Sequence, residues 1–176
     1  MSDNDPFAKL PDVPGFTVTS TTVNDGGTWP TAQMSGIVGV PGGKDISPHL
    51  SWSGAPEGTK SYTVTCYDPD APTPNGFWHW SVVDLPADIT SLDAGAGAEG
   101  ASLPGEAFML VNDGGTRGYM GAAPPPNDQV HRYFFVVHAV TEDSLGIDEN
   151  ASNAVMSFNL AFKTAGRAII TGTYQH

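Results

Sequence analysis

Two histidines, two carboxylates and a phenol stand at the ends of stretches typical of β-strands. They lie in three short segments, Asp-Pro-Asp-Ala-Pro (68–72), Trp-His-Trp (78–80) and His-Arg-Tyr (131–133). Imidazole and phenol groups are donors that hold a small anion at short range, and a neighbouring carboxylate raises the pKa of a histidine. The three segments therefore predict one small polar pocket for a phosphate-like anion.

Each of these residues also has an ordinary structural role to weigh against the pocket. A lone strand histidine more often satisfies buried backbone groups, but the prolines and carboxylates near His79 and His131 favour the pocket. Asp70 is interpreted as a turn former. Period-2 alternation places Trp78 and Trp80 on one strand face, opposite His79, so at least one of them is predicted to be core. An ordinary structural role is also assigned to the remaining histidines, His49, His138 and His176.

Metal binding and acid–base catalysis use the same residue types. Asp68, His79 and His131 form a ligand set that zinc or non-haem iron accepts, but their spacing matches no known ligand motif, so no metal or cofactor is predicted. The alternative to a binding protein is a hydrolase or isomerase in which the two histidines act as general acid and base and Asp68 orients them. The sequence contains no G-x-S-x-G elbow, phosphate loop or dinucleotide-binding motif.

The charge balance excludes several classes of partner. The chain has seven Lys and Arg and 19 Asp and Glu, a formal net charge of −12, which repels nucleic acid and anionic lipid surfaces.

The single cysteine, Cys66, alternates with Tyr62 and Val64, which predicts a buried structural thiol. Because the chain has no signal-peptide pattern and no bilayer-length apolar stretch, we expect a soluble cytoplasmic protein without membrane insertion.

The elements that position these residues are mostly short strands. Among 176 residues there are 21 Gly and 15 Pro, and apolar stretches end at these residues, which is typical of a strand-and-loop protein. An irregular arm is expected over residues 1–15, and a single domain over 16–176. Strands are predicted at residues 16–23, 61–67, 77–85, 107–111, 131–140 and 167–174.

One helix is predicted over residues 152–165, near the C-terminus. Asn150, Ser152 or Asn153 can cap its start, and Gly166 can end it. Its apolar side is predicted to consist of Val155, Phe158, Leu160 and Phe162.

In order and spacing, the motifs from Ser47 to Tyr133 resemble those of the phosphatidylethanolamine-binding protein family. They are Ser47-Pro48 with Leu50 and Trp52, Asp68-Pro69-Asp70-Ala71-Pro72, Trp78-His79-Trp80, Gly118-Tyr119 leading to Pro124-Pro125, and His131-Arg132-Tyr133. The short C-terminus and the His-Trp pair resemble the bacterial branch, described as Raf kinase inhibitor-like.

The resemblance implies a mainly β fold: an antiparallel β-sandwich with Greek-key connections, one or two short helices near the C-terminus and an anion pocket at one end. By position, the implied ligand-binding residues are Asp68, Pro72, His79, Ala123, His131 and Tyr133. The implied pocket rim is Asp70, Trp78, Tyr119, Met120 and Pro124. Ala123 replaces a glycine of the eukaryotic relatives.

The function implied is that of a non-enzymatic protein that binds phosphate, carboxylate or phosphorylated head groups. Regulation of a protein partner such as a kinase, and a homodimer, are further expectations from the resemblance.

Overall fold

The computed structural model describes residues 5–176, so the first four residues of the predicted arm lie outside the described part of the chain. The larger of two sheets contains, in spatial order, β2 (Gly27–Thr28), β9 (Thr164–Tyr174), β8 (His131–Val140), β4 (Ser61–Asp68), β5 (Phe77–Pro86) and β7 (Phe108–Met109). The smaller sheet contains β1 (Thr17–Thr19), β3 (Leu50–Ser53) and β6 (Ser91–Leu92). A 3-10 turn, η1 (Thr31–Gln33), and the helix α1 (Asn153–Lys163) complete the elements.

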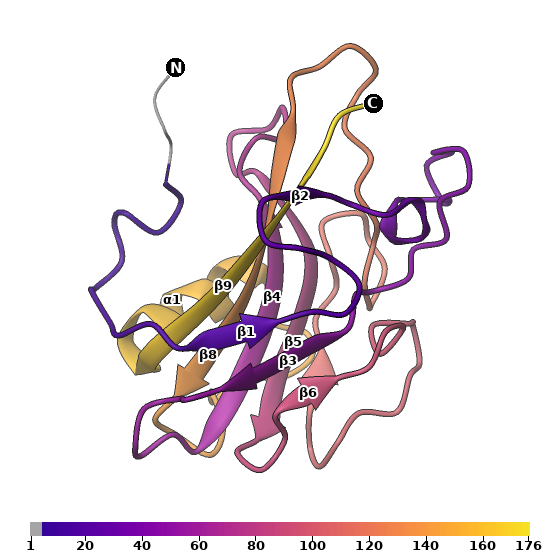
Figure 1. The fold of residues 1–176 in the computed structure, drawn as a ribbon. Coiled ribbons are helices and arrows are strands. Elements are labelled where there is room, and N and C mark those ends of the chain that lie inside the picture. The colour runs from indigo at the N-terminus through magenta and orange to yellow at the C-terminus, as the bar shows by residue number, and fades with distance from the viewer. Residues whose placement is uncertain (1–4) are drawn as a thin grey trace.

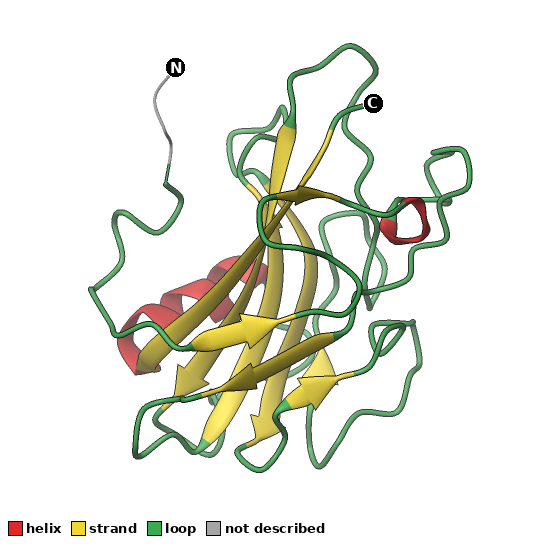
Figure 2. Cartoon of the chain, in the orientation of Figure 1, coloured by secondary structure: helices red, strands yellow, loops and turns green. Residues whose placement is uncertain are grey.

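The elements form three layers, with the small sheet on one face of the large sheet and α1 on the other (Figure 1). All strand pairs are antiparallel except β2 with β9. Figure 2 shows that strands and long loops dominate the molecule. The predicted mainly β, mostly antiparallel fold with a helix near the C-terminus is therefore confirmed. No helix within residues 5–176 has the length and hydropathy to cross a membrane.

The central strands are buried because both faces of the large sheet are covered. On one face, Val64, Cys66 and Phe135 belong to the main core, which we define as the buried apolar residues between the two sheets. On the other face, Val140 and Val83 pack with residues of α1 in a smaller helix-side core. A strand covered on both sides has no polar face, which explains the apolar sequence of β8.

A β-bulge in β5 corrects the predicted orientation of the tryptophans. Cys66 pairs with Trp80, but the next residue of β4, Tyr67, pairs with Trp78. His79 is thus an extra residue without an opposite partner in β4, and the strand's alternation is interrupted there. Trp80 enters the main core, whereas Trp78 packs against the helix-side core. The prediction that the two tryptophans share a face is wrong, and the prediction that one of them is core is confirmed.

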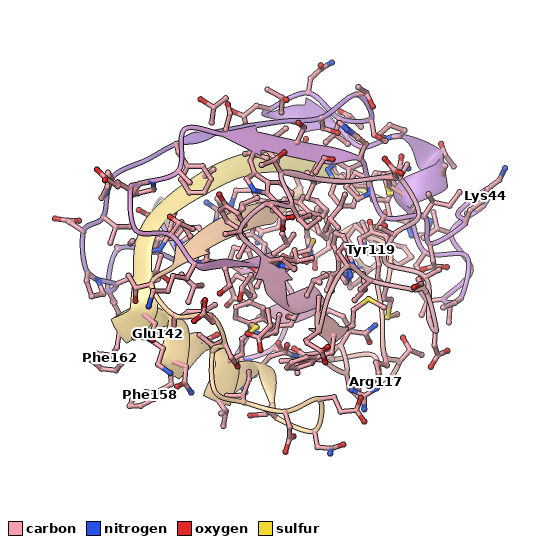
Figure 3. All side chains as sticks on the ribbon, turned by 90° about the horizontal axis from the view of Figure 1, so that it is seen from below. Lys44, Arg117, Tyr119, Glu142, Phe158 and Phe162 are labelled. Atoms are coloured by element: carbon pink, nitrogen blue, oxygen red, sulfur yellow. The ribbon has the colours of Figure 1, made fainter. Side chains whose placement is uncertain are left out.

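The helix begins as predicted, but it buries different residues. The Ser152 side chain caps it by accepting a hydrogen bond from the Val155 N–H. Met156 and Leu160 face the sheet, whereas Phe158 and Phe162 are 68% and 75% exposed; Figure 3 shows both projecting from the molecule. The predicted apolar side is therefore wrong for Val155, Phe158 and Phe162.

The predicted boundaries fail mainly at short or terminal elements. The helix ends at Lys163 and leads directly into β9, so Gly166 is a strand residue and not the helix stop. Only Thr17–Thr19 of the predicted strand over 16–23, and only Phe108–Met109 of that over 107–111, form ladders.

The orientation of α1 predicts that its two phenylalanines contribute less to the free energy of unfolding than its buried leucine does. Phe158→Ser and Phe162→Ser should each change the free energy of unfolding by less than about 0.5 kcal/mol, because both rings are exposed. Leu160→Ala should cost roughly 2–5 kcal/mol through a core cavity. Urea unfolding measures all three, and a loss in Phe158→Ser as large as that in Leu160→Ala would contradict this orientation.

Candidate functional site

A pocket of about 300 Å³ opens at the end of the large sheet where β4 ends and β8 begins. Its walls come from the end of β4, the β4–β5 loop, the start of β5, the segment after Tyr119, the start of β8 and one residue of an earlier loop. The lining residues are Val38, Asp68, Ala71, Pro72, Thr73, Phe77, His79, Met120, Gly121, Ala123, Pro124, Pro125, His131 and Tyr133.

The structure brings all six residues implied as ligand-binding to this pocket: Asp68, Pro72, His79, Ala123, His131 and Tyr133. Two of the implied rim residues, Met120 and Pro124, also line it. The other three, Asp70, Trp78 and Tyr119, do not. Trp78 is turned to the opposite face by the bulge, and the Tyr119 hydroxyl donates to the Gln33 carbonyl inside the core at 2.8 Å; Figure 3 shows Tyr119 within the molecule.

His131 is held between two carboxylates. Its Nδ1 lies 2.8 Å from Asp68 Oδ2, and its Nε2 lies 3.2 Å from Asp128 Oδ2. Asp68 and His131 are both buried, whereas Asp128 reaches in from an exposed loop. The second Asp68 oxygen, Oδ1, accepts hydrogen bonds from the backbone N–H groups of Asp70 and Ala71. With a carboxylate at each ring nitrogen, the arrangement favours the doubly protonated imidazolium.

The electrostatics of this group agree with its geometry. Burial alone would lower the pKa of His131, but the hydrogen bonds and charges of Asp68 and Asp128 together raise it above its ordinary value. Burial raises the pKa of Asp68, and the His131 interaction offsets only part of that effect. Deprotonation of His131 therefore removes the cation that compensates a buried carboxylate.

His79 has the opposite character. Burial is the largest effect and lowers its pKa to about 4, despite hydrogen bonds to the Met120 and Gly121 backbone. A neutral ring donates from Nδ1 to the Met120 carbonyl at 2.8 Å, which leaves Nε2 with a lone pair. The raised pKa expected for a histidine beside a carboxylate is thus not found for His79, and its Nε2 can act as an acceptor.

Tyr133 supplies a donor between the two histidines. Its ring makes an edge contact with His79 and a stacked contact with His131. Its buried hydroxyl has no hydrogen-bond partner within residues 5–176. Burial, followed by the Asp68 charge, raises the pKa of Tyr133, so the hydroxyl keeps its proton.

Asp70 and Arg132 fix the relative position of the two strand ends. The Arg132 guanidinium donates from Nε at 2.8 Å to Oδ2 and from the terminal Nη2 at 2.9 Å to Oδ1 of Asp70, and the Arg132 backbone N–H donates to Oδ2. Burial opposes ionisation of Asp70, but these bonds and the Arg132 charge hold its pKa below the ordinary range. Asp70 therefore supports the pocket as an ion-pair partner across 62 positions of sequence.

Two further carboxylates support the pocket and were not singled out from the sequence. Asp45 Oδ2 accepts from the N–H groups of Gly36 and Ile37, and its Oδ1 accepts from that of Gly121. A side chain at Gly121 would overlap the backbone at Met34, so the close approach requires glycine. In the sequence, the only indication of a role for Asp128 was its position three residues before His131, and nothing indicated a role for Asp45.

No group of three His, Cys, Asp or Glu side chains suited to a metal ion occurs in the described part of the chain.

Comparison with known proteins gives the same family throughout. The model of the family described as phosphatidylethanolamine-binding protein matches residues 19–175. The Escherichia coli UPF0098 protein YbhB is 44% identical over 155 residues, which are 88% of this chain and 97% of that protein. The crystal structure of E. coli YbcL, described as a new member of the mammalian PEBP family, superposes with a TM-score of 0.87 at 40% identity, covering 92% of this chain and 98% of YbcL.

The fold similarity extends to a more distant bacterial protein. A putative PEBP homologue from Chlamydia trachomatis is 26% identical and superposes with a TM-score of 0.76, covering 92% of this chain and 98% of its own. The bacterial relatives support the bacterial branch indicated by the sequence.

Replacement of Asp68 by Asn should lower the pKa of His131. The folded-state pKa of His131 exceeds its unfolded value of about 6.5. The pair therefore stabilises the fold fully below that pH, and this contribution is lost as pH rises through the folded-state pKa. NMR titration of the His131 ring should give a lower pKa in Asp68→Asn and an unchanged pKa in Asp88→Asn, an exposed control. An unchanged His131 pKa in Asp68→Asn would contradict the pairing.

Proposed function

The chain belongs to the phosphatidylethanolamine-binding protein family, and from this premise we propose that it binds a singly protonated oxyanion, best represented by a phosphate monoester, in the pocket at Asp68, His79, His131 and Tyr133. The observation that carries the proposal is the buried Tyr133 hydroxyl, which has no hydrogen-bond partner within residues 5–176. It lies between His131, held by two carboxylates, and His79, whose Nδ1 is bonded to the Met120 carbonyl. Pro72 and Ala123 complete the proposed ligand-binding wall.

The proposed recognition needs both donors and an acceptor. The Tyr133 hydroxyl and the His131 imidazolium can donate to anionic oxygens, and charge-assisted bonds of this kind are the stronger ones. The Nε2 lone pair of His79 can accept from a P–OH group. A fully ionised phosphate lacks that proton and is repelled by Asp68, so the monoanion is the favoured form.

Asp128 is the natural competitor for such a ligand. Its carboxylate already accepts from His131 Nε2, at 3.2 Å, from a partly exposed position. An incoming oxyanion that displaces this carboxylate gains the same donor while Asp128 returns to water. We therefore include displacement of Asp128 in the proposal.

The remainder of the pocket suits a small substituent on the phosphate. Val38, Phe77, Met120, Pro124 and Pro125 give it an apolar lining, and a volume of about 300 Å³ exceeds that of a bare phosphate. Small-molecule pockets typically combine such walls with a few convergent polar groups. A phosphorylated head group fits this combination better than the inorganic ion alone.

Binding is favoured over acid–base catalysis by the state of the histidines. Carboxylates at both ring nitrogens favour a protonated His131, and a protonated imidazole has no lone pair with which to act as a general base. His79 has its pKa lowered to about 4, well below the value that suits a general acid at neutral pH. The pair therefore supports holding an anion more than transforming one.

Titration with phosphoethanolamine near pH 6, followed through the ring NMR signals of His79 and His131, tests the proposal. Both signals should move and saturate. Sulfate, which carries no proton at this pH, should bind at least about tenfold more weakly because the His79 interaction is lost. Unchanged His79 and His131 signals at high ligand concentration would refute the pocket, and equal binding of sulfate would refute the requirement for a protonated oxygen.

Three variants sharpen this titration. Tyr133→Phe removes the proposed donor and should weaken binding by roughly tenfold or more, whereas Tyr62→Phe, at the far end of β4, should not. Asp128→Asn should strengthen binding near pH 6, because the competing charge is gone while His131 remains protonated. Weaker binding by Asp128→Asn would contradict the competition.

A further inference from the structure

A second pocket lies on the opposite face of the large sheet, between the N-terminal arm and α1. Its volume is about 180 Å³. The lining residues are Pro6, Phe7, Leu10, Thr65, Tyr67, Trp78, His138, Ser157 and Leu160. None of them lines the first pocket, and the bulge at His79 directs Trp78 to the helix side, away from Trp80 in the main core.

The arm forms one wall of this pocket and contacts the large sheet at two places, one near Phe7 and one at Pro11 and Pro14. The Phe7 ring makes an edge contact with Phe134, at 5.6 Å between centroids. Further along, the Arg167 guanidinium donates to the Pro11 carbonyl and the Arg167 backbone N–H donates to the Pro14 carbonyl. These contacts hold the arm over the sheet, with apolar side chains facing the pocket.

Two lining residues carry buried polar atoms that have no hydrogen-bond partner within residues 5–176. These atoms are Nδ1 of His138 and Oγ of Ser157. His138 is only 5% exposed, and its other nitrogen, Nε2, lies 3.3 Å from the Thr65 hydroxyl. Since buried polar groups are almost always hydrogen-bonded, this pair indicates a ligand with a hydrogen-bonding group.

The rest of the lining indicates an aromatic ligand without charge. Tyr67 and Trp78 stack at 4.6 Å between ring centroids and form one wall. Among the described residues that line the pocket, none is Asp, Glu, Lys or Arg. Burial also lowers the pKa of His138 to about 3, so its ring offers no positive charge to an anion.

We propose that this second pocket binds a neutral, single-ring molecule that carries one hydroxyl group, a ligand of the phenol class. The size agrees, since a cavity of about 150 Å³ accommodates benzene, and the pocket is slightly larger. The hydroxyl can donate to one of the two unpartnered atoms and accept from the other; Ser157 serves in either direction, and His138 in the direction that its tautomer allows.

NMR titration of the full-length protein with phenol tests this proposal. The His138 ring and Trp78 indole signals should shift together and saturate, with a dissociation constant on the order of 1 mM for so small a ligand. Toluene, which lacks the hydroxyl, should bind roughly threefold to tenfold more weakly. Benzoate, which is charged, should leave both signals unchanged.

Variants on two walls of the pocket provide the controls. Ser157→Leu fills the pocket from α1 and should weaken phenol binding at least about tenfold, whereas Ala154→Leu, at an exposed position of the same helix, should not. Phe7→Ala removes an arm residue from the wall and should weaken binding, and the exposed neighbour Lys9→Ala should have no effect.

The proposal is overturned if phenol leaves the His138 and Trp78 signals unchanged at about ten times the expected dissociation constant. It is equally overturned if Ser157→Leu, shown to be folded by its thermal transition, binds phenol as well as Ala154→Leu. Benzoate binding as strong as that of phenol would reject a neutral ligand class.

Discussion

Asp68 and His131 lie at the point where β4 ends and β8 begins, and their contact determines what the pocket can do. Both side chains are buried, and a buried charge is costly unless it is paired and hydrogen-bonded. The pair meets this condition through the 2.8 Å contact, two backbone N–H groups on Asp68 and the Asp128 carboxylate on the outer side of the ring. The same requirement favours the protonated form of His131, while the buried Tyr133 hydroxyl has no partner among the described residues.

The large sheet separates two chemically different environments. Its end near Asp68 holds a pocket lined by Asp68, His79 and His131. The face covered by α1 and the arm holds a pocket that has no Asp, Glu, Lys or Arg among the described residues lining it. The bulge at His79 contributes to this division, because it places Trp78 and Trp80, which a regular strand would direct to one face, on opposite faces of the sheet. Bulges are frequent beside functional sites for this reason.

The sequence predicted the structure best where the pattern of a single strand or a single set of motifs was enough to determine it. The strand over 131–140 was predicted with its observed bounds, and the resemblance brought the pocket residues together by position. Prediction from the local sequence pattern failed where contacts between distant segments determine the orientation of a side chain. The bulge breaks the period-2 rule for Trp78, and α1 has only a narrow contact with the sheet, which leaves Phe158 and Phe162 exposed. Asp45 contacts Gly121 across 76 positions of sequence, a separation that no local motif reveals.

The central claim is that the pocket contains one cationic and one neutral histidine. The imidazole nitrogen-15 chemical shifts and one-bond N–H couplings of the two rings, measured at neutral pH without ligand, test it most directly. We expect both nitrogens of His131 to carry protons and His79 to be the neutral tautomer protonated at Nδ1. A neutral His131, or a His79 protonated at Nε2, would contradict this account of the pocket.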